Sequence, residues 1–139
     1  ISVMNKKKNF IVVDFGTATT FDVIKKNNYL GGVIAPGVTL SLDNLIKKAS
    51  LIPHIKLNKS KSIIGKNTKQ AVLSGFFWGY NGLINGIISK IKKKTNQKYK
   101  IVFTGGLAHL FNKDIKDKVT IDKNLTINGL IKVSKHFNL

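Results

Sequence analysis

Cysteine, arginine and glutamate are all absent from the 139 residues. Without cysteine the chain can form no disulfide framework, no thiolate metal site and no cysteine nucleophile. The absence of cysteine also fits a reducing compartment, and we expect a cytoplasmic protein. Without arginine the chain lacks the planar guanidinium group that reads base edges through two parallel hydrogen bonds.

Lysine takes the place of arginine, with 24 basic residues against 6 acidic ones and a net charge of +18. Lysine binds phosphate as a point charge, so this balance leaves nucleic-acid binding open. Lysine, isoleucine and asparagine are abundant together, however, as AT-rich codon usage produces in any protein. We therefore interpret Lys6–Lys8 and Lys92–Lys94 as solvated faces or element ends, and do not expect a nucleic-acid partner.

One apolar stretch, residues 71–91, has about the length of a membrane span. Asn81 and Asn85 interrupt it, and polar neighbours recur at helical spacing. A buried or interface helix fits this pattern better than a membrane span. Residues 1–10 show no secretory signal, because they lack a long apolar run.

The hydrophobic periodicity predicts one mixed α/β domain. Three strands at residues 11–14, 20–25 and 29–35 should form an antiparallel meander. A helix at 38–50 and a polar loop at 57–65 follow, and then a long helix that begins at Asn67 or Thr68 and reaches about Lys93. The expected remainder comprises a strand (99–104), a short helix (107–112), a short strand (119–122) and a closing helix (125–137).

The long helix carries glycines at positions 75, 79, 82 and 86, a spacing that places them on one stripe. Each costs roughly 1 kcal/mol relative to alanine in a helix interior. Close approach of another backbone would offset this cost. That backbone belongs either to the sheet of the same chain or to a second copy of the helix, and the sequence leaves both open.

The segment Asp14–Thr20 (DFGTATT) combines a carboxylate at the end of a buried strand with a glycine and three threonines. Gly16 allows a tight turn, and successive N–H groups in a turn at residues 17–20 would form an anion nest. Asp14 cannot face a phosphate without a cation between them, so it implies a metal ion. The alternative is a hairpin whose hydroxyls cap their own backbone.

Further motifs follow in a specific order, and together they resemble the C-terminal half of type III pantothenate kinases over about residues 10–137. They are DFGTATTFD (14–22), GGVIAPG (31–37), IGKNT (64–68), SG (74–75), YNG (80–82), TGGLA (104–108) and NLTINGL (124–130). The resemblance implies the RNase H-like half of an actin-like ATPase fold. It also implies transfer of the γ-phosphoryl group of ATP to pantothenate, the first step of coenzyme A synthesis.

The resemblance also implies roles for individual residues. Asp14 matches the position that holds a monovalent cation, K⁺ or NH₄⁺, and Mg²⁺ is expected with ATP. Thr68 matches a threonine that contacts pantothenate. ATP contacts are expected from the second phosphate loop and from the glycines where this superfamily packs the adenosine: Gly16, Thr17, Thr19, Gly105 and Gly106. The glycine-bearing helix (68–93) resembles the family's dimer-forming helix, so a homodimer is expected.

The general base of the family and its first phosphate loop belong to an N-terminal half that this sequence does not contain. We therefore expect residues 1–9 to be a linker from that half and residues 10–139 to be the C-terminal domain. No catalytic residue is expected in the chain, which should be inactive alone. Asp22 is interpreted as a strand or turn residue, and the remaining aspartates as surface loop or cap positions (Asp43, Asp114, Asp117 and Asp122).

Three other functions remain open. The same family is similar to accessory factors of transcription control, so the chain could be a non-catalytic regulator. It could belong to another small-molecule kinase on the same fold. It could also be a scaffold that dimerises through the glycine-bearing helix and binds no nucleotide.

Overall fold

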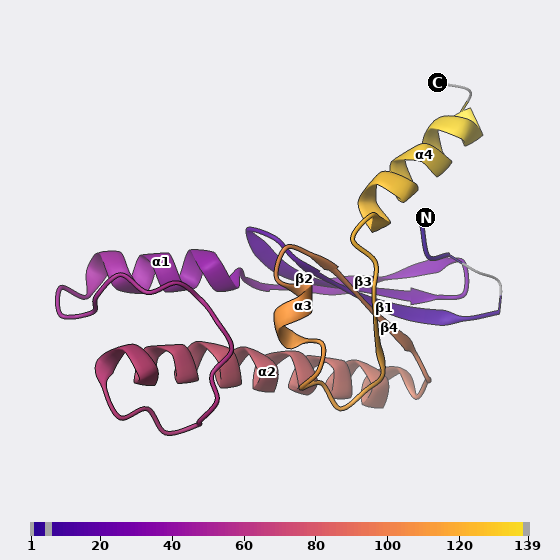
Figure 1. Cartoon of the computed structure of the whole chain (residues 1–139). Coiled ribbons are helices and arrows are strands. Elements are labelled where there is room, and N and C mark those ends of the chain that lie inside the picture. The colour runs from indigo at the N-terminus through magenta and orange to yellow at the C-terminus, as the bar shows by residue number, and fades with distance from the viewer. Residues whose placement is uncertain (1, 5–6, 138–139) are drawn as a thin grey trace.

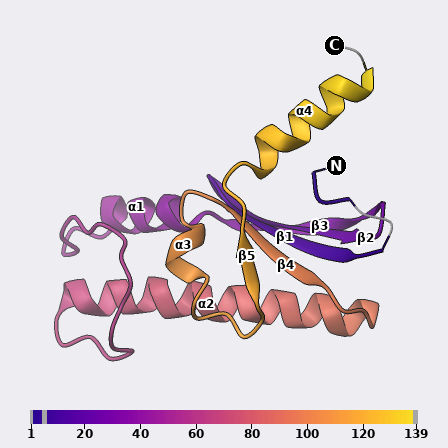
Figure 2. The same cartoon turned by 45° about the vertical axis from the view of Figure 1, so that its right-hand side comes forward.

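The computed structural model describes residues 2–4 and 7–137; Ile1, Asn5 and Lys6 of the expected linker and lysine run lie outside that range, as do the last two residues. The fold is built on one five-stranded sheet in the order β3-β2-β1-β4-β5 (Figures 1 and 2). Its strands are β1 (Asn9–Phe15), β2 (Ala18–Lys25), β3 (Asn28–Pro36), β4 (Lys100–Gly105) and β5 (Val119–Ile121). The first three form an antiparallel meander, whereas β4 pairs with β1 and β5 with β4 in parallel.

The sheet has two faces of different character because side chains alternate along each strand. On the first face Ile11, Val13 and Phe15 join the main core, together with Phe21 and Phe103 from neighbouring strands. On the second face a smaller cluster forms around Val12, Ile24, Val102 and Leu125. Asp14, Thr20 and Thr104 also lie on this second face.

Helix α2 (Thr68–Thr95) covers the first face of the sheet (Figure 1). Asn67 caps it, because the Asn67 side chain accepts a hydrogen bond of 2.9 Å from the Gln70 N–H. The side of α2 that faces the sheet carries Phe77, Ile84 and Ile88, each of which is at most 1 % exposed. Helix α1 (Val38–Lys48) runs roughly alongside α2, and the Tyr80 hydroxyl joins the two helices through Ser41 Oγ at 3.0 Å.

The C-terminal part of the chain contributes α3 (Ala108–Phe111) and α4 (Leu125–Phe137). Figures 1 and 2 both show α4 extending away from the sheet and from α2. Ile127, Leu130 and Ile131 are accordingly exposed by 46 to 64 %. The N-terminal residues lie near the start of α4, where Lys132 Nζ donates to the Ser2 carbonyl at 2.8 Å.

The predicted α/β class and order of elements are confirmed, and boundaries moved by two residues or fewer, with two differences. Thr19 and Thr20 already belong to β2, so the turn comprises Gly16 and Thr17 only. Asp43 lies inside α1, so its interpretation as a loop or cap position was wrong. Among the described helices, none combines the length and apolar character needed to span a membrane.

The four glycines of α2 are not packed against their own chain. A Cβ atom added at position 75, 79, 82 or 86 would meet nothing within 4 Å. Packing of this stripe on the sheet, one of the two alternatives raised by the sequence, is therefore excluded.

Candidate functional site

A pocket of about 490 Å³ lies at the end of the sheet where β1 and β4 terminate. Three segments that are distant in sequence form its walls. Phe15, Gly16 and Thr17 come from the β1–β2 turn, and Gly106 and Leu107 follow β4. The first turns of α1 supply Thr39, Leu40 and Asp43. Three of the residues expected to bind ATP, Gly16, Thr17 and Gly106, are thus brought together.

The start of α1 lies directly against the β1–β2 turn. The N-cap of α1 is Gly37, which has no side chain that could accept a hydrogen bond from the first N–H groups of the helix. The first turn of α1 also contains no acidic residue. The first N–H groups of a helix have no intrahelical partner and carry the positive end of its dipole. With Thr39 and Leu40 in the pocket wall, the start of α1 can therefore attract an anion, while the Asp43 carboxylate in the same wall opposes it.

The turn itself offers fewer free amides than the sequence suggested. The Gly16 N–H is already engaged, since it donates to the Ala18 carbonyl at 3.1 Å. Among the backbone hydrogen bonds that the described residues form in turns, loops and caps, none has the Thr17 N–H as its donor. The turn can thus present the Thr17 amide and hydroxyl to an anion, rather than a run of successive N–H groups.

The two glycines after β4 have different physical roles. Gly105 adopts a φ of +88°, and a Cβ there would approach Phe15 O to 2.6 Å and Asp14 Oδ1 to 2.7 Å. The fold therefore requires glycine at this position. A Cβ at Gly106 would meet nothing within 4 Å, so Gly106 leaves open space in the pocket wall.

Asp14 lies on the second face of the sheet, between two threonines. Its register partners are Thr20 on β2 and Thr104 on β4. Partners in register point to the same face, so a carboxylate and two hydroxyl groups form one row across three strands. Burial raises the pKa of the Asp14 carboxyl above its usual value, and the charge of Asp22 raises it further.

This row provides oxygen ligands of the type that hard cations prefer. Thr104 is only 4 % exposed, so its hydroxyl belongs to the buried part of this row. A cation beside Asp14 would offset the cost of the buried charge and the repulsion from Asp22. The residues present therefore fit a cation that takes oxygen ligands.

Four predicted site residues do not line the pocket: Asp14 and Gly105, described above, and Thr19 and Thr68. Thr19 is fully buried in the sheet, and its hydroxyl has no hydrogen-bond partner among the residues that the structure describes. Thr68 is the first residue of α2. The end of β3, just before α1, is contacted by a later residue of the same helix, Tyr80, whose hydroxyl lies 3.1 Å from Pro36 O. At 1.5 Å per residue, Thr68 lies about 18 Å along the helix axis from that contact.

The sequence interpretation missed the contribution of α1. Thr39 and Asp43 both line the pocket and are four residues apart. Residues at this spacing lie on one side of a helix, which was the available signal. The spacing alone does not predict a contribution to the site, because no local pattern shows that α1 begins beside the β1–β2 turn.

Comparison with known proteins connects this geometry to a family. Residues 1–90 match the profile of the family described as "Type III pantothenate kinase". The type III pantothenate kinase of Pelagibacter ubique (strain HTCC1062) is 59 % identical over 134 residues, which cover 96 % of this chain and 54 % of that protein. The chain spans about half the length of the curated relatives it matches.

Solved structures show the same fold. A Campylobacter jejuni protein, provisionally described as a Baf family transcriptional activator, aligns with a TM-score of 0.67 at 26 % identity, over 96 % of this chain and 61 % of that one. MreB 5 of Spiroplasma citri, bound to AMPPNP, aligns with a TM-score of 0.64 at 10 % identity, over 94 % of this chain and 54 % of that one. The second likeness shows the fold alone, which is that of actin-like ATPases. By its sequence, this chain belongs to the type III pantothenate kinase family.

Proposed function

We propose that this chain is the nucleotide-binding part of an enzyme that transfers the γ-phosphoryl group of ATP to pantothenate, the first step of coenzyme A synthesis. The observation that carries the proposal is the pocket formed by the β1–β2 turn, the start of α1 and Gly106. Family membership supplies the identity of the substrates. We infer a cytoplasmic enzyme, since the reaction uses ATP.

In phosphoryl transfer the protein mainly positions the reactants and neutralises charge. The Thr17 hydroxyl and amide and the start of α1 bind the terminal phosphates of ATP in this proposal. Gly106 leaves room for the nucleoside, and Gly105 holds the end of β4 against Asp14. Thr19 does not contact ATP in this proposal. It is a buried residue of β2, the strand that follows the turn, and supports the turn from there.

The row formed by Thr20, Asp14 and Thr104 is proposed to hold K⁺ or NH₄⁺. The cation offsets negative charge beside the phosphates, whereas Mg²⁺ arrives with ATP, as is usual for kinases. No residue of this chain is assigned as the base that deprotonates the pantothenate hydroxyl. The resemblance assigns that step to the half of the family's sequence that this chain does not span, so we expect no turnover from these 139 residues alone.

The role of Thr68 as a pantothenate contact rests on the resemblance. Thr68 lies apart from the nucleotide pocket, at the N-terminus of α2, so a substitution there should separate the two substrates. In the complete enzyme, Thr68→Val is expected to raise the KM for pantothenate and leave ATP affinity unchanged. A loss of ATP affinity in this variant would contradict the assignment.

The glycine stripe supports a homodimer through α2. Its four glycines have open space at their Cβ positions, so the cost of glycine in a helix is not offset within the chain. Close approach of the same helix from a second copy would offset it. We propose this contact as the dimer interface of the enzyme.

Nucleotide binding tests the central assignment. In Thr17→Val the hydroxyl is lost at nearly constant volume, and ATP affinity measured by calorimetry should fall by about tenfold, the loss expected for one hydrogen bond to a charged group. Thr126→Val on the remote helix α4 is a matched control and should bind ATP normally. An unchanged dissociation constant in Thr17→Val would exclude the pocket as the phosphate site.

Activity tests the reaction. We expect ATP-dependent phosphorylation of pantothenate only when this chain is combined with the N-terminal half of a family member. Turnover by the 139 residues alone would show that the chain contains its own base. Turnover of another acceptor in place of pantothenate would identify a different kinase on the same fold.

A second candidate function is a non-catalytic regulator of transcription. The net charge of +18 and the likeness to the Campylobacter jejuni protein favour it. It predicts retention on duplex DNA at about 0.15 M salt, with affinity falling steeply as salt rises. The kinase proposal predicts no such retention.

A further inference from the structure

An apolar hollow lies between the edge strand β3 and the last turns of α2. Figures 1 and 2 both show why this place is uncovered, since α1 runs beside the first half of α2 only. The space encloses about 340 Å³. We call it the edge hollow, and its walls include Leu30, Gly31 and Val33 from β3 and Lys90, Ile91 and Lys94 from α2.

An irregularity in the strand pairing places Leu30 in the wall of the edge hollow. Val23 of β2 pairs with Gly31 and Ile24 pairs with Tyr29, so Leu30 is an extra residue without a partner on β2. Bulges of this kind redirect a side chain and are common beside functional sites. Gly31 adopts a φ of +114°, and a Cβ there would meet nothing within 4 Å. Glycine thus permits the bulge and leaves its part of the hollow open.

The β3 wall of the hollow is apolar and partly open to solvent. Leu30 is 50 % exposed and Val33 is 37 % exposed, and Ile91 adds an apolar side chain from α2. Edge strands are commonly protected by lysine. Residues 27–42 nevertheless contain no charged residue, although 22 % of the chain is charged. A concave apolar surface with few polar groups is typical of a site for a small molecule.

Two ammonium groups border this apolar surface. Lys90 and Lys94 are four residues apart, so they lie on the same side of α2. Neither has a carboxylate partner among the described residues, in contrast to Lys92, which pairs with Asp117. The alkyl stem of a lysine can lie along apolar surface while its ammonium group stays in water. The α2 wall therefore presents positive charge at the rim of the hollow.

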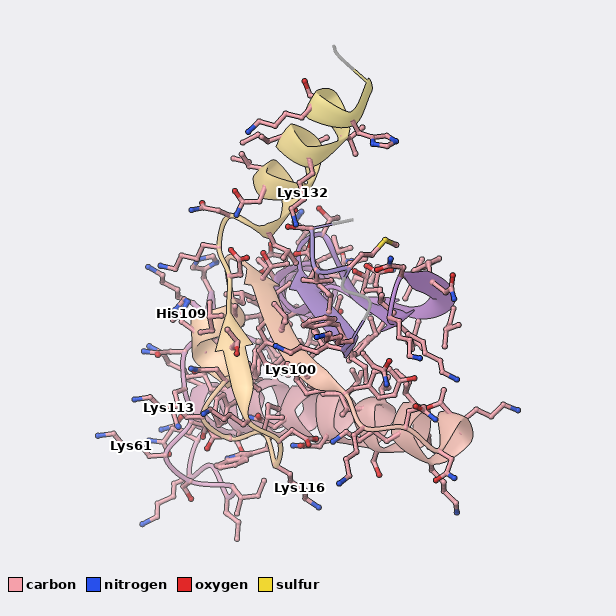
Figure 3. All side chains as sticks on the ribbon, turned by 90° about the vertical axis from the view of Figure 1, so that its right-hand side faces the viewer. Lys61, Lys100, His109, Lys113, Lys116 and Lys132 are labelled. Carbon is pink, nitrogen blue, oxygen red and sulfur yellow. The ribbon has the colours of Figure 1, made fainter. Side chains whose placement is uncertain are left out.

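Positive charge alone does not distinguish this place. Figure 3 shows lysines on several elements, with Lys61 on a loop, Lys100 on β4 and Lys132 on α4. The edge hollow differs because it joins an apolar recess to a charged rim. A ligand that fits both features needs an apolar part and an anionic end.

We propose that the edge hollow binds the free anion of a medium-chain fatty acid. The apolar chain lies against Leu30 and Val33 and removes them from water. The carboxylate lies at the rim, where Lys90 and Lys94 donate charge-assisted hydrogen bonds. The volume is at the lower end of the range of about 300–1,000 Å³ for small-molecule sites, which suits a single short chain. None of the residues named for the hollow lines the nucleotide pocket, so this site is independent of the proposed function.

An NMR titration of the ¹⁵N-labelled chain with sodium decanoate, kept below the concentration at which it forms micelles, tests the site. Amide shifts should change and saturate at residues 30–33 and 90–95. They should stay constant at residues 15–17, in the nucleotide pocket. Acetate has the carboxylate without the chain, and decanol has the chain without the charge. Each should bind about tenfold more weakly than decanoate or worse, because each satisfies only one half of the site.

Charge variants on one helix separate the hollow from the general basicity of the chain. In the Lys90→Gln, Lys94→Gln double variant, saturation should require about tenfold more decanoate, as expected for the loss of two charge-assisted contacts. The Lys69→Gln, Lys93→Gln double variant is the matched control. It removes two exposed charges from the same helix at positions that do not line the hollow, and it should bind as the unmodified chain does.

A variant of the apolar wall tests the other half of the site. Leu30→Ala shortens a side chain that is already half exposed, so the fold should be kept. Decanoate should bind about fivefold more weakly, because part of the buried apolar contact is lost.

Three results would overturn the proposal. Equal weakening in the two double variants would indicate general attraction between a basic chain and an anion. Acetate binding as strongly as decanoate would indicate a simple anion site. Shifts at residues 30–33 that move with protein concentration and not with decanoate would show that a second copy of the chain covers the hollow.

Discussion

The carbonyl oxygen of Thr17 occupies the position that a side chain on Gly37 would need. A Cβ atom at Gly37 would lie 2.0 Å from that oxygen, far inside any permitted contact. The N-cap of α1 and the β1–β2 turn are therefore fitted to each other through bare backbone. Since both segments line the proposed nucleotide pocket, this contact sets the shape of that pocket.

Gly37→Ala should consequently destabilise the protein and distort the pocket. The added methyl group forces the turn or the start of α1 to move, and overpacking of this kind costs about 1–3 kcal/mol. Chemical denaturation should show the loss in the free energy of unfolding, and calorimetry should show weaker ATP binding. A variant with unchanged stability and affinity would mean that the two segments are not in contact in solution.

Gly16→Ala and Gly106→Ala should behave in the opposite way. A Cβ at Gly16 would have only one ordinary contact, 3.7 Å from Ala18 O, and one at Gly106 would have none. Neither backbone adopts a positive φ. Stability should therefore stay within about 0.5 kcal/mol of the unmodified chain, as for substitutions outside strained or packed positions.

Their effect should appear in ligand binding instead, because both residues line the pocket. We expect ATP affinity to fall while the free energy of unfolding does not. Normal ATP binding by both variants would show that the nucleotide does not approach these glycines.

Most of the fold could be predicted from the sequence because its signals are local. The β-branched run of β1, the Asn67 cap and the glycines that stop strands each act within a few residues. The strand pairing followed from the short connections of the meander. The parallel position of β4 beside β1 had no local signal, and it is this pairing that brings Gly106 to the β1–β2 turn.

The site was predicted less completely for the same physical reason. Asp14, Gly16 and Thr17 share one short motif, whereas Thr39 and Asp43 join the pocket only because Gly37 fits against Thr17. The burial of Thr19 follows from the strand alternation that places it beside Phe21 and Val23 on the core-facing side. A motif shows which residue types are present, but tertiary packing decides which of them reach the surface.

The Asp14 carboxyl group should titrate above its ordinary pKa of 3.8, and ¹³C NMR can observe it among only six aspartates. Burial is the larger cause of the shift and the charge of Asp22 the smaller. Asp22→Asn should therefore lower the pKa of Asp14 only in part. A complete return to the ordinary value would mean that repulsion, rather than burial, dominates.

The same shift has a consequence for stability. Between the ordinary and the raised pKa, the folded chain binds more protons than the unfolded chain, so stability falls as pH rises through this interval. At neutral pH, in buffer without K⁺ or NH₄⁺, Asp14→Asn should accordingly be more stable than the unmodified chain. Denaturation in choline chloride measures this difference. Addition of K⁺ should stabilise only the chain that retains the carboxylate.

The glycine stripe of α2 allows monomer stability and self-association to be separated. Gly79→Ala places a methyl group in open space, so in the monomer it should raise the free energy of unfolding by roughly 1 kcal/mol through helix propensity alone. If α2 packs closely against a second copy, the same methyl group should weaken association. Gly79→Leu should weaken it more strongly because the larger side chain separates the two backbones.

Sedimentation at several protein concentrations checks the association, and denaturation at the lowest concentration checks the monomer. Lys69→Ala, at an exposed position in the first turn of the same helix, is the matched control and should leave the association constant unchanged. Association that is indifferent to leucine at position 79 would place the dimer contact elsewhere. The cost of four glycines would then remain uncompensated by any packing of the described chain, because every one of their Cβ positions is open.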